Sequence, residues 1–485
     1  MKKSVLGFIL AGCMTLSLIA CGSSNVDDTQ NGAEVNRNTL DEAYEGVQTL
    51  GVTEDKIYIG NTVATSGEFA TVGIPFNLGL NAALKVYNDN GGFGGKTVEL
   101  IHYDDAFHAE QGLNLTKKLI EEDQIFALVG HFGTPTITAT LDYITSEIGI
   151  PMIYGVTGTS QLYQEEASGF GQAVMPVQPI YTTEGQMLLV RAVAPMEGNL
   201  GLGGTKIGVI STNDEMGKGL LAGIQKQEKE IADVIVKYVT TVADKGADCS
   251  SAVNALKEEG CDVIILAVNK AAMGELITNM KDADLGNVKI ITSYVNGDEQ
   301  FLSSLPITER MEVYTTDWLD ITSATYVYTP SEDNVAGVYL WACYQALAGD
   351  DATMYEDGVS GYSEEYWKAA EAICAYDLAV NGAASTTAFA NSYNSYALAG
   401  YIAGTMFLEG LHRVEESQQE LTWQNYIKAM ESAPVDIPMG GSVNLANGAR
   451  LGTTDFALNR YDLSSKKLIL YSEITTIESV KKITN

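Results

Sequence analysis

From Lys56 onward the chain alternates short apolar runs with longer stretches that have helical spacing. The first series of short runs includes IYIGNTVA (57–64), TVELIHYDD (97–105) and IFALVG (125–130). A second series with the same rhythm extends over residues 206–294, from KIGVIST to VKIITSY. Short apolar strands separated by crossover helices are typical of parallel sheets that helices cover on both faces. We therefore expect an α/β protein with two lobes, each built on its own sheet.

The first residues have the pattern of a lipoprotein export signal. Lys2 and Lys3 precede an uncharged, largely apolar stretch that ends at Ala20, and Cys21 follows directly. This stretch is short beside the roughly 20 residues that span a bilayer, so cleavage is favoured over a retained helix. We predict a signal peptide over residues 1–20 and lipid attachment to Cys21, which would anchor the protein at the extracytoplasmic face of the cell membrane.

Cys13 also follows small residues and is a second candidate for lipid attachment. Its use would leave an apolar core of only residues 5–9, whereas a signal core usually needs roughly 7 to 15 residues. Residues 21–52 are polar with few large apolar side chains, so we predict a flexible tether there. The first lobe is then expected to begin near residue 53.

The composition excludes two broad classes of protein. Hydrophobic residues make up 46% of the chain, which is enough for buried cores and argues against disorder. The 62 acidic residues outnumber the 29 basic ones and give a formal net charge of −33. Such a chain would be repelled by nucleic acid and by anionic membrane surfaces. We therefore expect no nucleic-acid partner.

The cysteines and tyrosines leave two questions open. Cys249 and Cys261 flank one predicted helix, which would hold them beyond disulfide reach. For Cys343 and Cys374 a disulfide and two free thiols are both compatible with the pattern.

Residues 320–384 are rich in tyrosines with acidic neighbours. Such tyrosines are typical of half-buried surface, and they also suit stacking against a sugar or an aromatic ligand.

Several segments together carry a resemblance to a known family. In chain order, behind the predicted signal, they are IYIGNTVATSGEFATVGIPFNLGLNAALKVYNDNGGFGGKTVELIHYDD, VGHFGTPTITATLDYITSEIGIPMIYGVTGTSQL, STNDEMGKG, and YALAGYIAGTMFLEGL with LTWQNYIKAM. In this combination the chain resembles the branched-chain amino acid type of ABC-transporter substrate-binding protein, the leucine/isoleucine/valine-binding family. The resemblance covers roughly residues 56–474.

The resemblance implies the type I periplasmic-binding-protein fold, in which three crossover strands join two α/β lobes. Each lobe would be discontinuous, with 53–177 plus 320–437 in the first and 178–319 plus 438–485 in the second. It also implies a non-catalytic receptor without a cofactor. Such a receptor closes by a hinge motion on a small-molecule ligand, an amino acid or a related small carboxylate or amide, and hands it to an ABC permease in the membrane.

Two loops at predicted strand ends form the candidate carboxylate site. Gly133 and Thr134 follow one strand and open a helix, and Gly155 and Thr157 follow the next strand. Free backbone N–H groups and hydroxyls at adjacent strand ends suit an anion. The resemblance implies that Thr134, Gly155 and Thr157 hold the α-carboxylate of the ligand. The alternative is ordinary helix capping by Thr134 beside a glycine-rich turn.

Ser66 and Phe69 follow the first strand, where the family has a loop that edges the ligand. Phe69 would then form a wall for an apolar ligand side chain, because ligand pockets are largely lined by apolar groups. Packing of Phe69 beneath the loop is an equal alternative.

The second lobe departs from the pattern of the family. Met216 stands where amino-acid-binding relatives tend to carry an aromatic residue. Tyr294, Val295 or Asn296 aligns with their acidic partner for the ligand ammonium, and Asp298 comes slightly later. A buried ammonium without a carboxylate partner is costly. Either Asp298 or another acid therefore fills this role, or the ligand has no ammonium.

Enzyme and metal hypotheses find little support in the sequence. The run from His102 to His108 contains metal-ligand residue types but is extended, whereas a tetrahedral site needs convergent ligands. His131 and His412 are expected to be surface or capping residues. The chain has no nucleophile-elbow motif and no zinc-protease motif, so an exported hydrolase is the least favoured function. A ligand sensor of the same fold that signals to a membrane partner is the main alternative to transport.

Overall fold

The computed structural model describes residues 38–231, 236–243, 245–246, 248–348, 358–382 and 387–484. The predicted signal peptide, residues 1–20, and Cys21 lie outside these residues, so lipid attachment stays a prediction. No helix in the described part of the chain has the length and apolar character needed to cross a membrane. From Asn38 onward the chain forms one compact unit.

Part of the predicted tether is folded. The short helix α1 (Asn38–Ala43) buries Leu40, and Tyr44 is 6% exposed. The hydroxyl of Tyr44 donates to the carbonyl of Gly149 (2.5 Å), and its ring meets that of Phe170 edge to face. The prediction of a flexible tether is therefore wrong from residue 38 onward, because two apolar side chains suffice to fix this polar segment.

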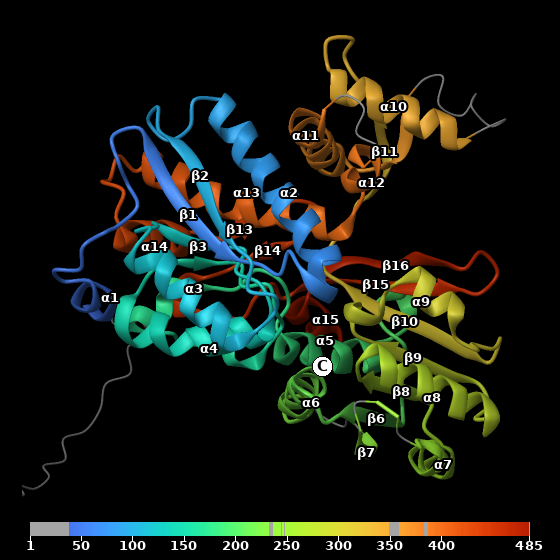
Figure 1. Cartoon of the computed structure of the whole chain (residues 1–485). Coiled ribbons are helices and arrows are strands. Elements are labelled where there is room, and N and C mark those ends of the chain that lie inside the picture. The colour runs from blue at the N-terminus through green and yellow to red at the C-terminus, as the bar shows by residue number, and fades with distance from the viewer. Residues whose placement is uncertain are drawn as a thin grey trace, which may run out of the picture. The chain divides into compact units, whose positions relative to one another are not determined.

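The first sheet has five parallel strands in the order β2-β1-β3-β4-β5. In its register Ile59 pairs with Leu100 on one side and with Ala127 on the other. Its strands are β1 (Lys56–Thr62), β2 (Thr97–Tyr103), β3 (Ala127–Val129), β4 (Met152–Ile153) and β5 (Val174–Met175). Its helices are α2 (Ala70–Asp89), α3 (Ala109–Glu121), α4 (Thr134–Asp142), α13 (Ser395–Glu416) and α14 (Trp423–Glu431), seen in Figure 1.

The second sheet has seven strands in the order β16-β15-β10-β9-β8-β6-β7. Strands β6 to β10 are parallel, and β15 and β16 are added antiparallel at the β10 edge. The strands are β6 (Ile207–Thr212), β7 (Val236–Val242), β8 (Val263–Ala267), β9 (Val288–Thr292), β10 (Met311–Asp317), β15 (Asp455–Asp462) and β16 (Lys467–Thr476). The helices are α5 (Tyr181–Val193), α6 (Glu215–Glu228), α7 (Ser250–Glu259), α8 (Lys270–Asp282), α9 (Glu299–Ser304) and α15 (Ile477–Thr484).

The chain passes three times between the two sheets, after β5, after β10 and before β15. The three crossing segments bond to one another. The N–H of Asp320 donates to the carbonyl of Met439 (2.6 Å), and the N–H of Thr453 donates to that of Val177 (2.9 Å). Two sheets, helices on their faces and three crossings confirm the predicted two-lobed α/β fold. The exact lobe boundaries stay a prediction.

Close helix packing explains the glycines of α13. A Cβ on Gly400 would lie 1.8 Å from the carbonyl oxygen of Phe76 in α2. A Cβ on Gly79 of α2 would likewise lie 1.8 Å from the carbonyl oxygen of Ala397. The two helix backbones therefore touch, which only glycine permits at these positions. The next helix, α14, has Thr422 as its N-cap: the Thr422 hydroxyl accepts from the N–H of Asn425 (3.1 Å).

The tyrosine-rich stretch forms a group of packed aromatic rings within the larger hydrophobic core, drawn with α10 to α12 in Figure 1. Tyr328 stacks on Trp367 with ring centroids 3.9 Å apart, and the hydroxyls of Tyr344 and Tyr366 are 2.8 Å apart. These four rings are less than 9% exposed, so the expectation of half-buried surface is wrong for them. The elements here are β11 (Thr322–Tyr328), α10 (Val335–Ala348), β12 (Val359–Tyr362), α11 (Glu364–Asn381) and α12 (Ala388–Ser392).

Cys343 and Cys374 lie on α10 and α11 and carry thiols rather than a disulfide. The remaining short elements complete the described chain. They are η1 (Gly67–Phe69), η2 (Tyr143–Ile148), η3 (Ser160–Leu162), η4 (Gly169–Ala173), η5 (Glu197–Asn199), η6 (Tyr294–Asn296), η8 (Ala446–Gly448), β13 (Val435–Asp436) and β14 (Ser442–Val443).

Candidate functional site

Thr134 and Thr157 lie together at the carboxyl ends of β3 and β4. Gly133, with a φ of 95°, precedes α4, and Thr134 is the first residue of that helix. Thr157 follows β4 and is 5% exposed. The Oγ1 atoms of Thr134 and Thr157 are 2.8 Å apart. The structure therefore brings together the two hydroxyls that the sequence pattern assigns to adjacent strand ends, and their ligand role stays a prediction.

Some of the backbone donors predicted for this site are used within the protein. The N–H of Thr157 donates to the carbonyl of Gly155 (2.9 Å), and the N–H of Gly133 donates to that of Val156 (3.3 Å). The expectation that these N–H groups are free is wrong, because the loop after β4 turns on itself and pairs with the loop after β3. The alternative that Thr134 caps the helix is also wrong, because Gly133 is the N-cap and Thr134 is the first residue within α4.

A row of phenylalanines borders the two threonines. Phe69 stacks on Phe107 with centroids 3.9 Å apart, and Phe107 lies 6.0 Å from Phe132. A Cβ on Gly133 would come within 2.6 Å of the Phe107 ring, so this ring lies directly against the start of α4. Phe69 thus packs against other aromatic rings, and its role as a wall for a ligand side chain stays a prediction. Ser66 is exposed and hydrogen-bonds with Asp104.

The sequence pattern gives no sign of Phe107. It follows β2 with a φ of 64°, next to Ala106 with a φ of 47°. Two consecutive non-glycine residues in the left-handed region are uncommon and strained, and such strain clusters at functional sites. Asp104 and Asp105 fix this turn by accepting from the N–H groups of Ala106 and Phe107 (both 2.9 Å). The turn aims the Phe107 ring at Gly133.

Contacts from the second lobe reach the same loop. The Thr159 hydroxyl donates to Oε1 of Glu215, at the start of α6 (2.9 Å), and the N–H of Thr159 donates to Oγ1 of Thr157 (3.1 Å). A Cβ on Gly158 would lie 2.6 Å from the ring of Tyr181, the first residue of α5. Glu215 and Tyr181 are therefore site neighbours that the sequence pattern did not indicate.

The residues predicted on the second lobe have different surroundings. Met216 is 7% exposed in the first turn of α6, and Asn296 is fully buried. The Nδ2 of Asn296 donates to the carbonyl of Val268 and to Oγ1 of Thr292 (both 2.8 Å), whereas its Oδ1 has no hydrogen-bond partner among the described residues. The side chain of Asn296 therefore ties the ends of β8 and β9 together.

Asp298 is not a free acid for a ligand ammonium. Its carboxylate accepts from the N–H of Phe301 (2.7 Å) and caps α9, and it pairs with Lys270 (3.5 Å). Helix N-caps commonly use an aspartate in this way. The suggestion that Asp298 supplies the acidic partner therefore loses its support, because a capping role and a cation already occupy this side chain.

Tyr154, Tyr294 and Trp318 add aromatic surface near the hinge. Tyr154, directly before Gly155, has a φ of 56°, and its ring meets that of Trp318 edge to face at 6.2 Å. The Nε2 of Gln178 donates to the Tyr294 hydroxyl (3.4 Å). Burial raises the pKa of Tyr294, and the nearby charges of Tyr181, Glu184, Tyr154 and Asp317 raise it further. Tyr294 therefore lies among groups of both lobes.

His131 is part of the core. It is fully buried, its Nδ1 accepts from the N–H of Thr62 (3.2 Å), and its Nε2 lies 3.2 Å from the Thr116 hydroxyl. Burial lowers its pKa to about 3, so the ring is neutral. The expected surface or capping role is wrong, because the ring is satisfied inside the lobe. In the described residues no cluster of three or more metal-ligand side chains occurs.

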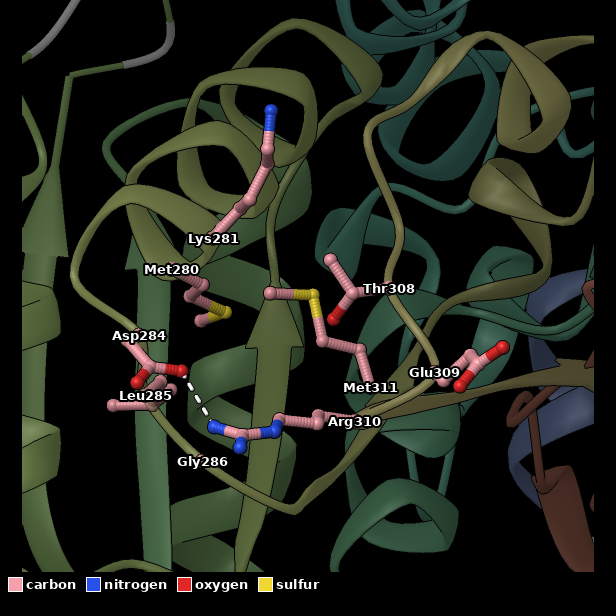
Figure 2. A pocket seen from close by; sticks show the side chains of 9 residues that line it. All are labelled: Met280, Lys281, Asp284, Leu285, Gly286, Thr308, Glu309, Arg310 and Met311. Carbon is pink, nitrogen blue, oxygen red and sulfur yellow. Dashed lines mark hydrogen bonds and ion pairs between the residues drawn. The ribbon is translucent and has the colours of Figure 1, made fainter.

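A surface hollow lies at the amino ends of strands β9 and β10 in the second sheet. Figure 2 shows it between the end of α8 and the start of β10, with Arg310 and Asp284 paired (2.7 Å). These residues precede β9 and β10, whereas Tyr294 and Trp318 follow them. Because ligands of parallel α/β sheets bind beyond the carboxyl ends of the strands, the site stays with the threonines rather than with this hollow.

The family model described as periplasmic binding protein matches residues 56–466. The chain belongs to the periplasmic binding protein family. This family consists of substrate-binding proteins rather than enzymes, and it confirms the predicted resemblance and type I fold. Its members bind small molecules such as amino acids and work with ABC permeases outside the cytoplasm.

Three known proteins show how similar this chain is to its relatives. The amino acid binding protein of Pseudomonas aeruginosa is 25% identical over 231 residues, covering 47% of this chain and 58% of the relative. The Leu/Ile/Val-binding protein of Escherichia coli K12 is 22% identical over 334 residues, which cover 66% of this chain and 84% of the relative. A fatty acid ABC transporter substrate-binding protein from Thermomonospora curvata superposes with a TM-score of 0.59 at 16% identity, covering 90% of this chain and 97% of that one. This last likeness concerns the fold alone.

Proposed function

We propose that this protein is the lipid-anchored substrate-binding component of an ABC importer and that it captures an amino acid between its lobes by hinge closure. The observation that carries the proposal is the pair of hydroxyls on Thr134 and Thr157, 2.8 Å apart at adjacent strand ends. The lipid anchor would be Cys21, and the partner would be an ABC permease. The relatives described as amino acid and Leu/Ile/Val-binding proteins support this class of ligand.

The first lobe supplies hydrogen-bond donors for the ligand carboxylate. Each threonine hydroxyl can donate one proton, and α4 begins at Thr134, so its N-terminal dipole favours negative charge there. Hydrogen bonds to an ionised acceptor are roughly twice as strong as neutral ones. The two hydroxyls, which now face each other, would each turn to an oxygen of the carboxylate.

The second lobe presents several acids near the site. The charges of Glu184, Asp214 and Glu215 all act on Tyr181, whose pKa burial raises first and these carboxylates raise further. A ligand with only a negative charge would be repelled by these groups, whereas an ammonium would be attracted. This asymmetry favours a zwitterion, with its carboxylate toward the first lobe and its ammonium toward the second.

Glu215 is the acid with room for the ammonium. Asp214 already accepts from Gly217, Thr212 and Asn269, at 2.7 to 2.8 Å. Glu215 accepts one hydrogen bond, from Thr159, and joins none of the ion pairs among the described residues. An ionised carboxylate has about four lone-pair positions. Glu215 therefore takes the role that the sequence pattern assigned to Asp298 or another acid.

Matched ligands test this arrangement. Calorimetric titration of the purified protein with leucine and with its deaminated analogue 4-methylpentanoate should give tighter binding of leucine. Glu215→Gln should lower leucine affinity by about tenfold, or about 1.4 kcal/mol, and leave 4-methylpentanoate unchanged. Glu228→Gln, at the other end of α6, is the matched control. If the deaminated acid bound as tightly as leucine or more tightly, the ligand would be a simple carboxylate and not an amino acid. If neither compound bound, the proposal would be overturned.

A further inference from the structure

Glu184 is a buried carboxyl in the first turn of α5 that bonds to three groups of other elements. Its Oε1 accepts from the N–H of Tyr294 (2.9 Å) and the hydroxyl of Thr316 (2.5 Å), and its Oε2 accepts from the hydroxyl of Ser293 (2.8 Å). Glu184 itself is 0% exposed. One side chain therefore joins α5, the turn η6 and the end of β10.

These three partners lie where the second lobe meets the crossing segments. Ser293 and Tyr294 follow β9, and Thr316 is the last residue but one of β10. Tyr294 N–H also reaches Oγ1 of Thr316 (3.0 Å). The backbone position of Tyr294 thus depends on Glu184, and the Tyr294 hydroxyl accepts a hydrogen bond from Nε2 of Gln178 (3.4 Å).

No positive charge balances this carboxyl among the groups that act on it most strongly. Burial raises its pKa to about 7, its three hydrogen bonds oppose that rise, and the charge of Asp317 on β10 adds to it. The titratable groups that face Glu184 are Asp317, Tyr294 on η6 and Tyr181 on its own helix. On α6, Asp214 and Glu215 come next, through Tyr181.

We propose that Glu184 is a positioning residue whose ionised carboxylate holds the Tyr294 turn at the ligand site, so that capture of an amino acid is coupled to release of a proton from Glu184. The inference rests on the proposed function, since the ammonium of the ligand provides the missing positive charge. An opposite charge nearby favours the ionised form of a carboxyl.

The hydrogen-bond pattern around Glu184 also favours the ionised carboxylate. All three partners of Glu184 donate to it, and the backbone N–H of Tyr294 can only donate. A protonated carboxyl turns one of its acceptor oxygens into a donor and so fits this set less well. Ionisation of Glu184, closure around Tyr294 and ligand capture therefore support one another.

The test is calorimetric titration of the purified full chain with leucine at pH 6, 7 and 8, with the pH 7 titration repeated in two buffers of different ionisation enthalpy. The inference predicts that affinity rises about three- to tenfold from pH 6 to pH 8 and that a fraction of a proton is released per leucine at pH 7. Glu184→Gln, which keeps an acceptor oxygen for Tyr294, should remove both effects. Glu473→Gln, exposed on β16, should keep them.

The outcomes separate this inference from the proposed function. Leucine binding that is independent of pH, proton uptake at pH 7, or an unchanged pH slope in Glu184→Gln would overturn the inference and leave amino-acid capture standing. The two-buffer measurement needs no variant, so it decides even if Glu184→Gln fails to fold. Absence of binding by leucine at every pH, and by other amino acids, would overturn both.

Discussion

The Thr159 hydroxyl donates a hydrogen bond of 2.9 Å to Glu215, and this contact joins the loop after β4 in the first lobe to the first turn of α6 in the second. The Thr159 N–H in turn donates to Oγ1 of Thr157, which lies 2.8 Å from that of Thr134. A chain of polar contacts thus runs from the predicted carboxylate site across the lobes. Hinge closure would tighten this chain around a ligand.

The paired hydroxyls give the first prediction. The double substitution Thr134→Ala with Thr157→Ala should weaken amino-acid binding by at least about tenfold, or about 1.4 kcal/mol, because it removes both side-chain donors. Thr134→Ser with Thr157→Ser keeps the hydroxyls and should bind nearly as the parent does. Calorimetry measures both. Equal affinity of the alanine and parent proteins would remove the carboxylate assignment.

The stability of the protein should depend on pH through Glu184. Its folded pKa of about 7 lies above its ordinary value of 4.5, so the folded state binds this proton more tightly than the unfolded state does. The resulting contribution is fully present below pH 4.5 and is lost as the pH rises through about 7. This contribution to the free energy of unfolding is on the order of 3 kcal/mol.

Asp317, with a pKa raised by burial to about 6, contributes in the same direction over a slightly lower range. Denaturant titrations of the ligand-free protein between pH 5 and pH 8 measure the sum. Glu184→Gln should flatten the upper part of the profile, and a stability that rises with pH in both proteins would contradict this account.

The contact between α2 and α13 predicts a steric effect. Gly400→Ala should lower the free energy of unfolding by roughly 1–3 kcal/mol, because its Cβ would meet the backbone carbonyl of Phe76. Gly274→Ala is the matched control within helix α8, where the new Cβ would meet only Leu305 at 3.6 Å. Helix propensity should make that variant neutral or more stable. Thermal unfolding compares the two, and equal melting temperatures would refute the close packing.

The folded start of the chain can be tested at Tyr44. Tyr44→Phe removes the hydrogen bond to Gly149 and should cost about 1 kcal/mol, whereas Tyr44→Ala also removes the buried ring and should cost about 3 kcal/mol or more. Glu45→Ala, an exposed neighbour, should have little effect. If both tyrosine variants match the parent in denaturant unfolding, this segment is the flexible tether that its composition suggested.

The periodicity of the sequence was enough for the two sheets, because apolar strands and amphipathic helices alternate with clear boundaries. The pairing of Thr134 with Thr157 also followed, since both end parallel strands of one sheet. The buried turn at Tyr44 did not follow, because two apolar residues among polar ones leave no period to detect.

The missed site residues have a different cause. Phe107 and Tyr154 reach the site through positive φ angles of 64° and 56°, and residue type gives no warning of such backbone outside glycine. Glu215 looked like an ordinary acidic residue of a first helical turn. Its partner Thr159 lies 56 positions earlier in the chain and becomes a neighbour only when the lobes meet.

A crystal structure of the protein with a bound amino acid would show directly which groups hold the ligand. We expect the ligand carboxylate within about 3 Å of the hydroxyls of Thr134 and Thr157 and the ammonium on the side of Glu215. A ligand bound elsewhere, such as in the hollow beside Arg310, or bound between the lobes without contact to either threonine, would contradict this expectation.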